Sequence, residues 1–190
     1  MLLLVTGLIL FFGIHSVSII NADWRDSMAQ RLGVAPWRVL YSLMSLGGLV
    51  LLIWGYGMAR SNPVILYTTP PWLHYVNYLL MLPVFTLFIA TYIPGKIKST
   101  VKHPTFTAIK IWAFAHLLVN GTHADVLLFG CFLAWAVAGR ISMKHRKQRP
   151  VMGLPAAPYN DLIAVLAGLG IYVLFFVVIH RWMTGIPLIF

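Results

Sequence analysis

Six long runs of apolar residues, separated by short polar connections, dominate the chain. Each run is roughly 20 residues long, the length that a helix needs to cross a bilayer. The runs cover Leu2–Ile20, Trp37–Met58, Trp72–Ile93, Pro104–Asn120, Asp125–Ile141 and Leu162–Trp182. This pattern predicts an all-α fold in which a single domain, residues 1–190, forms an integral membrane bundle of six transmembrane helices.

The composition agrees with a membrane protein and excludes several other classes. Apolar residues make up 60% of the chain and charged residues only 9%, whereas about a quarter of the residues in a soluble domain are charged. A soluble domain, a disordered chain and an ordinary nucleic-acid-binding protein are therefore excluded. We expect the lipid bilayer as a partner and no nucleic acid.

The net charge of +10 reflects the positions of the lysines and arginines along the chain. Most of them follow the first, third and fifth apolar runs: Arg25, Arg31, Lys96, Lys98, Lys102, Arg140, Lys144, Arg146, Lys147 and Arg149. Only Arg60 and Arg181 lie on the opposite side. Because basic connections stay in the cytoplasm, this bias predicts that both termini are non-cytoplasmic.

Histidines are the side chains best suited to chemistry inside the predicted bundle. An ionisable group at membrane depth is costly, so it faces the bundle interior and has a partner. His15 and His116 lie inside apolar runs, and His103 precedes Pro104 at the start of the fourth run. A structural hydrogen bond is the alternative role for the two deeper histidines, and an interfacial position at a helix start is the alternative for His103.

The surroundings of His116 strengthen the functional interpretation. Trp112 lies four residues before it and Asn120 four residues after it, so the three side chains share one helical face. Two buried imidazoles on different helices suit haem iron, which takes axial histidines in helix bundles. The same residue types also occur in proton relays and quinone sites, and periodicity leaves these two alternatives open.

A further open alternative is a metal site on the outer side, formed by His74, His123, Asp125 and His180.

The segment Lys102–Gly121 carries a basic residue, His-Pro, Trp-x-x-x-His and Asn-Gly in that order. This arrangement resembles the signature of the NnrU family, and Gly13-Ile14-His15-Ser16 and Ile179–Leu188 also match it. The resemblance covers nearly the whole chain. It implies a multi-pass protein of the bacterial inner (cytoplasmic) membrane that is associated with denitrification through a nitrite or nitric oxide reductase system.

A plant relative in the same family, 15-cis-zeta-carotene isomerase, is a membrane enzyme that contains haem b. By motif, its two haem-ligating histidines correspond to His15 and His116, which the resemblance implies are the axial ligands of the iron. His103, Trp112 and Asn120 become candidates for the surrounding pocket. Other ligand pairs stay open, namely His15 with His103, or His116 with His180 or His123.

Several functions are compatible with this resemblance, and whether the chain is an enzyme stays open. The first is a haem b protein in nitrite and nitric oxide metabolism, and the second is a haem-dependent cis-trans isomerase of a carotenoid or another long isoprenoid. A third is a non-enzymatic assembly factor, whose helix-packing stripe would be Gly130, Ala134 and Ala138. The segment Lys102–Phe106 also resembles isoprenylcysteine methyltransferases, but the chain has no glutamate for their cofactor region.

Overall fold

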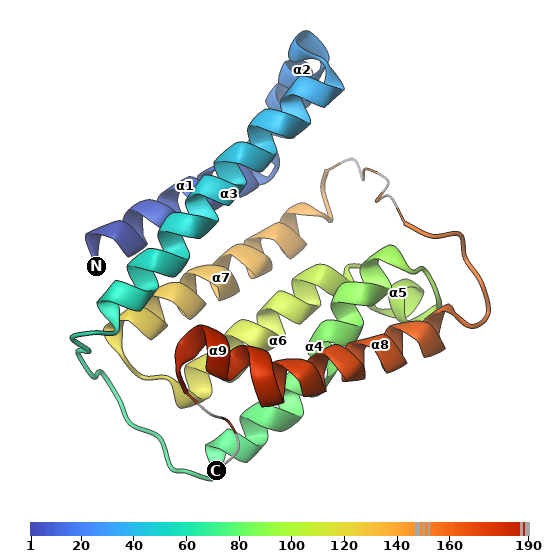
Figure 1. Ribbon diagram of the computed structural model, residues 1–190. Helices are drawn as coiled ribbons and strands as arrows, with labels where there is room; N and C mark the ends of the chain where they lie inside the picture. Colours follow the sequence, from blue (N-terminus) through green and yellow to red (C-terminus); the bar gives the residue numbers. More distant parts are fainter. Residues whose placement is uncertain (147–148, 150, 152, 187, 189–190) are drawn as a thin grey trace. The chain divides into compact units, whose positions relative to one another are not determined.

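The computed structural model describes residues 1–146, 149, 151, 153–186 and 188, and every regular element in these residues is a helix (Figure 1). The elements are α1 (Leu2–Ile20), α2 (Ala22–Leu32), α3 (Val34–Ala59), α4 (Leu73–Tyr92), α5 (Lys96–Val101), α6 (Pro104–Val119), α7 (His123–Ser142), α8 (Asn160–Leu174), a π-helix (Phe175–Ile179) and α9 (His180–Thr184). The predicted all-α fold is confirmed.

Among the described residues, five helical segments are long and apolar enough to cross a membrane. They are Leu2–Ile20, Val34–Ala59, Leu73–Tyr92, His123–Ser142 and Asn160–Thr184. The sixth predicted span corresponds to α6, which is apolar but has only 16 residues. At 1.5 Å per residue it extends about 24 Å, less than the roughly 30 Å of a hydrocarbon core. The six-span arrangement therefore stays a prediction.

The described chain forms two compact units. The first contains Met1–Tyr67 and Gly121–Lys147, and the second contains Thr68–Asn120 and Gln148–Phe190. Helices α1, α2, α3 and α7 belong to the first unit, whereas α4, α5, α6, α8, the π-helix and α9 belong to the second. The expectation of a single domain stays a prediction.

Glycines bring the backbones of α1 and α3 into direct contact in the first unit. A Cβ atom on Gly48 would lie 2.7 Å from the backbone nitrogen of Phe11. A Cβ on Gly55 would overlap the backbone of Leu4, and one on Gly7 would overlap the backbone of Leu52. Such contacts matter in a membrane, where van der Waals packing through small residues holds helices together.

The small residues of α7 do not make an equivalent contact in the described chain. A Cβ on Gly130 would meet nothing within 4 Å, and Ala134 and Ala138 are exposed. The described residues of the first unit therefore leave the predicted packing stripe uncovered, and its role in packing stays a prediction. A four-residue spacing of small side chains identifies a smooth surface, but it does not identify the neighbour that covers it.

A buried carboxylate joins α3 to the start of α7. Asp125, only 5% exposed, accepts a hydrogen bond from the Tyr56 hydroxyl at 2.5 Å. It also accepts from the backbone nitrogen and hydroxyl of Thr122, at 3.0 and 2.6 Å, and the hydroxyl of Thr122 accepts from the backbone nitrogen of Asp125. This reciprocal cap begins α7. Desolvation, with the charge of Asp125 adding to it, raises the pKa of Tyr67 in the connection between α3 and α4.

The second unit is built around α4. In this unit the Asn77 amide donates to the Ala115 carbonyl of α6 at 2.6 Å. On another side of α4, a Cβ on Gly168 of α8 would overlap the backbone of Thr86. Helix α4 continues through Pro83, and the Tyr172 hydroxyl donates at 3.2 Å to the carbonyl of Tyr78, shortly before that proline.

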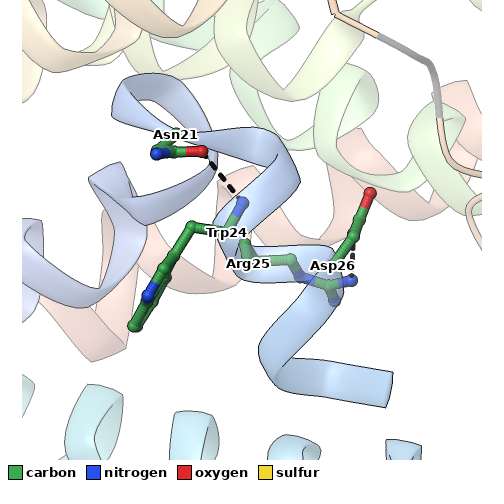
Figure 2. Close-up of polar contacts among 4 residues, drawn as sticks. All are labelled: Asn21, Trp24, Arg25 and Asp26. Carbon is green, nitrogen blue, oxygen red and sulfur yellow. Dashed lines mark hydrogen bonds and ion pairs between the residues drawn. The ribbon is translucent and has the colours of Figure 1, made fainter. Parts of the chain in front are cut away.

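Two short helices, α2 and α5, were not predicted from the apolar runs. The Asn21 carboxamide accepts a hydrogen bond from the Trp24 backbone nitrogen at 2.9 Å and so caps α2, and Arg25 and Asp26 form an ion pair on the same helix (Figure 2). Helix α5 begins where Asp161 of α8 accepts from two backbone nitrogens, those of residues 96 and 97, at 2.8 and 3.1 Å. A local cap begins α2 and a carboxylate distant in the sequence begins α5. Hydrophobic periodicity therefore could not predict either helix.

We expect Gly48→Ala to weaken the α1–α3 contact, because the new methyl group meets backbone atoms that cannot move independently. The cost should be about 1–3 kcal/mol in the free energy of unfolding, as for other overpacked sites. Gly47→Ala is the matched control, since a Cβ there meets nothing within 4 Å. Denaturant titration in detergent micelles measures both variants, and equal stability of the two would contradict the proposed role of Gly48.

Candidate functional site

His15 lies near the end of α1 and is half-buried. Its Nδ1 atom is 2.6 Å from the carbonyl oxygen of Phe11, one helical turn earlier. A carbonyl oxygen can only accept, so Nδ1 carries the proton and donates it. The neutral ring therefore holds its lone pair on Nε2, which is the atom that can bind a metal.

Aromatic rings from three helices surround the His15 imidazole. The Phe11 ring stacks on it with centroids 4.1 Å apart and an interplanar angle of 27°. The Tyr41 ring of α3 meets it edge-on at 5.3 Å, and the Trp135 ring of α7 does so at 6.0 Å. We call Phe11, Tyr41 and Trp135 the aromatic box. Sequence reasoning missed the box because periodicity does not show which helices are neighbours.

His116 of α6 makes the same hydrogen bond within its own helix as His15 does. Its Nδ1 atom is 2.8 Å from the carbonyl oxygen of Trp112, so the proton again lies on Nδ1 and the lone pair on Nε2. The Trp112 ring lies 5.2 Å from the imidazole, at an interplanar angle of 49°. The Asn120 amide donates to the His116 carbonyl at 3.0 Å. Trp112 and His116 are thus in ring contact on α6, and Asn120, directly after the end of this helix, contacts the His116 backbone.

Asn77 adds a second support to this part of α6. It is only 8% exposed, and its amide donates to the carbonyl of Ala115, the residue directly before His116. Two asparagine side chains therefore hold consecutive carbonyls of α6, those of residues 115 and 116. Sequence reasoning missed Asn77, although an amide within an apolar run is a signal of an inward-facing functional or structural group.

His103 lies at the opposite end of α6 from His116. Its backbone nitrogen donates to the Val101 carbonyl at 2.8 Å, with Lys102 between them at φ +64° and ψ −46°. This is a γ-turn, a strained conformation for a residue with a side chain. It directs the chain into α6 at Pro104. The uninterrupted helix then separates His103 from His116 by about 20 Å along its axis.

The predicted ligand residues are distributed over both compact units. His15 belongs to the first unit, and His103, Trp112, His116 and Asn120 belong to the second. Within the described part of the chain, no three His, Cys, Asp or Glu side chains gather to hold a metal ion. The outer residues are divided in the same way, with His123 and Asp125 in the first unit and His74 and His180 in the second, so an outer metal site also stays a prediction. The roles of His15 and His116 as metal ligands stay predictions.

Comparison with known proteins identifies the family. The family model described as NnrU protein matches residues 3–188, nearly the whole chain. Comparison with curated proteins and with solved structures gave no match. Because the family model spans both units and every site residue discussed above, the chain belongs to the NnrU family.

Proposed function

We propose that this NnrU-family protein binds haem b through His15 and His116 and acts in nitrite and nitric oxide metabolism. The observation that carries the proposal is a hydrogen bond that both histidines make with their own helix. In each, Nδ1 donates to the carbonyl oxygen one turn earlier, at 2.6 Å in His15 and 2.8 Å in His116. Metal-ligating histidines commonly donate their second ring N–H in this manner, which fixes the tautomer and the ring orientation.

The donor set of the described residues fits a haem. His15 and His116 would hold the haem iron as neutral imidazoles, and no further metal-binding side chain would be needed from the protein. Aromatic rings beside both histidines supply apolar surface of the kind that a porphyrin contacts. A haem held by two imidazoles supplies one-electron redox chemistry.

The protein's own groups would orient the ligands and exclude water. The carbonyls of Phe11 and Trp112 hold the Nδ1 protons of His15 and His116. The amides of Asn77 and Asn120 fix the α6 backbone around His116. The surrounding apolar helices lower the local dielectric constant, which strengthens each of these polar contacts.

The nitrogen-oxide role rests on membership of the NnrU family. The resemblance to this family implies an association with nitrite and nitric oxide reduction, so we propose a reductase system as the partner. A haem held through two histidines would suit this chemistry because it would exchange single electrons, and it could bind nitric oxide once one histidine leaves the iron. Neither the isomerase nor the assembly-factor alternative is favoured by a specific contact in the described residues.

We also propose that the chain crosses the bacterial cytoplasmic membrane six times, with both termini outside the cytoplasm. The five long apolar helices support a multi-pass protein. Helix α6 supplies the sixth crossing, and it is short because Pro104 fixes its start and Asn120 follows its end. The bias of basic residues toward alternate connections supports the orientation.

His15→Ala and His116→Ala should each abolish stoichiometric haem binding, because one remaining imidazole cannot complete the axial pair. The measurement is the haem content and Soret absorbance of protein purified from haem-supplemented cells. His74→Ala is the matched control: His74 also contacts a carbonyl three residues earlier, but it is exposed. Imidazole and haem added together to the His116→Gly variant should restore the spectrum. Wild-type haem content in the double alanine variant would refute the ligand assignment.

Deletion of the gene from a denitrifying bacterium should slow the reduction of nitrite and nitric oxide. The wild-type gene should restore both rates, whereas the His15→Ala and His116→Ala genes should not, since the proposed cofactor would be absent. Gly47→Ala serves as the complementing control. Full restoration by the double alanine variant would separate the nitrogen-oxide role from the histidines.

The orientation can be tested by cysteine labelling in a Cys131→Ser background. Ser61 and Ser99 are exposed and lie in connections that are proposed to face opposite sides of the membrane. A membrane-impermeant maleimide should label Ser61→Cys in spheroplasts and Ser99→Cys only in inverted vesicles. Labelling of both from the same side would contradict six crossings.

A further inference from the structure

We propose that Tyr41 and Trp135 are positioning residues that fix the plane of the His15 imidazole. The consequence for a haem ligand rests on the proposed function. The contacts themselves involve only side chains of the first unit. Neither residue belongs to α1, which carries His15. Their action on His15 therefore depends on how α3 and α7 pack against α1.

The hydrogen bond of His15 by itself gives an incomplete constraint. The bond from Nδ1 to the Phe11 carbonyl spans one turn of a single helix, so it persists in α1 even when the other helices move. It holds one edge of the ring but permits the ring to tilt about that edge. A second constraint from outside α1 is needed to select one plane.

The aromatic box supplies that constraint from two directions. The Tyr41 ring meets the imidazole at an interplanar angle of 62° and the Trp135 ring meets it at 87°. Both contacts are of the edge-to-face type that aromatic quadrupoles favour. The stacked Phe11 ring covers one face at 4.1 Å. Tilting the imidazole would disturb all three contacts together, so the box selects one orientation.

The box is linked to the close contact between α1 and α3. Phe11 supplies both the carbonyl that holds His15 and the backbone nitrogen that faces Gly48. Tyr41 lies seven residues before Gly48, two turns earlier on the same helix face. The separation of the two helices thus determines how closely Tyr41 approaches His15.

The first test uses the protein without haem. In histidine-labelled protein in micelles, nitrogen NMR should show the Nδ1-protonated tautomer of His15, with its signal assigned through His15→Ala. Tyr41→Leu and Trp135→Leu should each speed exchange of the Nδ1 proton by about tenfold, the effect of losing one aromatic contact. Tyr41→Phe should keep the wild-type rate, because it retains the ring.

The matched control is Trp54→Leu, which removes an aromatic ring of α3 that is 63% exposed and should leave the exchange rate unchanged. If a leucine variant does not accumulate as folded protein, Trp135→Phe provides a smaller change at the same position and should give an intermediate rate. Wild-type exchange in both Tyr41→Leu and Trp135→Phe would overturn the inference.

The second test uses the haem-loaded protein. The ferric low-spin electron paramagnetic resonance spectrum depends on the relative planes of two axial imidazoles, so Tyr41→Leu and Trp135→Leu should shift its largest g-value at unchanged haem content. Tyr41→Phe and Trp54→Leu should reproduce the wild-type spectrum. Unchanged g-values in both leucine variants would overturn the inference. Absence of haem from the wild-type protein would instead refute the proposed function, and the NMR result would still decide the positioning role.

Discussion

The backbone contact between α1 and α3 is the constraint on which the first unit depends. Gly7, Gly48 and Gly55 each occupy a place where a methyl group would meet the backbone of the opposite helix. Lipid tails are as apolar as the side chains of these helices, so burial away from water does not drive the helices together in a membrane. Close van der Waals packing holds them together instead. The contact also brings Tyr41 to the imidazole of His15, so the packing of the unit and the orientation of its histidine have one cause.

Both candidate ligands use the same local chemistry in different surroundings. Each donates Nδ1–H to a carbonyl of its own helix, and each has an aromatic ring beside the imidazole. The supporting groups differ: rings from α3 and α7 surround His15, whereas amides hold the backbone at His116. In the proposed haem protein, the plane of one ligand would depend on helix packing and that of the other on hydrogen bonds.

The sequence predicted those features that are local to one helix. The first helix has the predicted bounds, Leu2–Ile20, because apolar composition and length suffice to define a span. The contact between Trp112 and His116 was predictable because residues four apart share a helical face. Contacts between helices were not predictable in this way. Asn77, Tyr41, Trp135 and the glycines that join α1 to α3 were missed, because spacing does not identify neighbours.

We propose above all that His15 and His116 hold one haem b iron between them. Near-infrared magnetic circular dichroism of the oxidised, purified protein tests it most directly, because the energy of the charge-transfer band identifies the axial ligands of low-spin ferric haem. If His15 and His116 both bind the iron, the band should lie at the energy that two neutral imidazoles give. A high-spin spectrum, a band of another ligand pair or the absence of haem would contradict it.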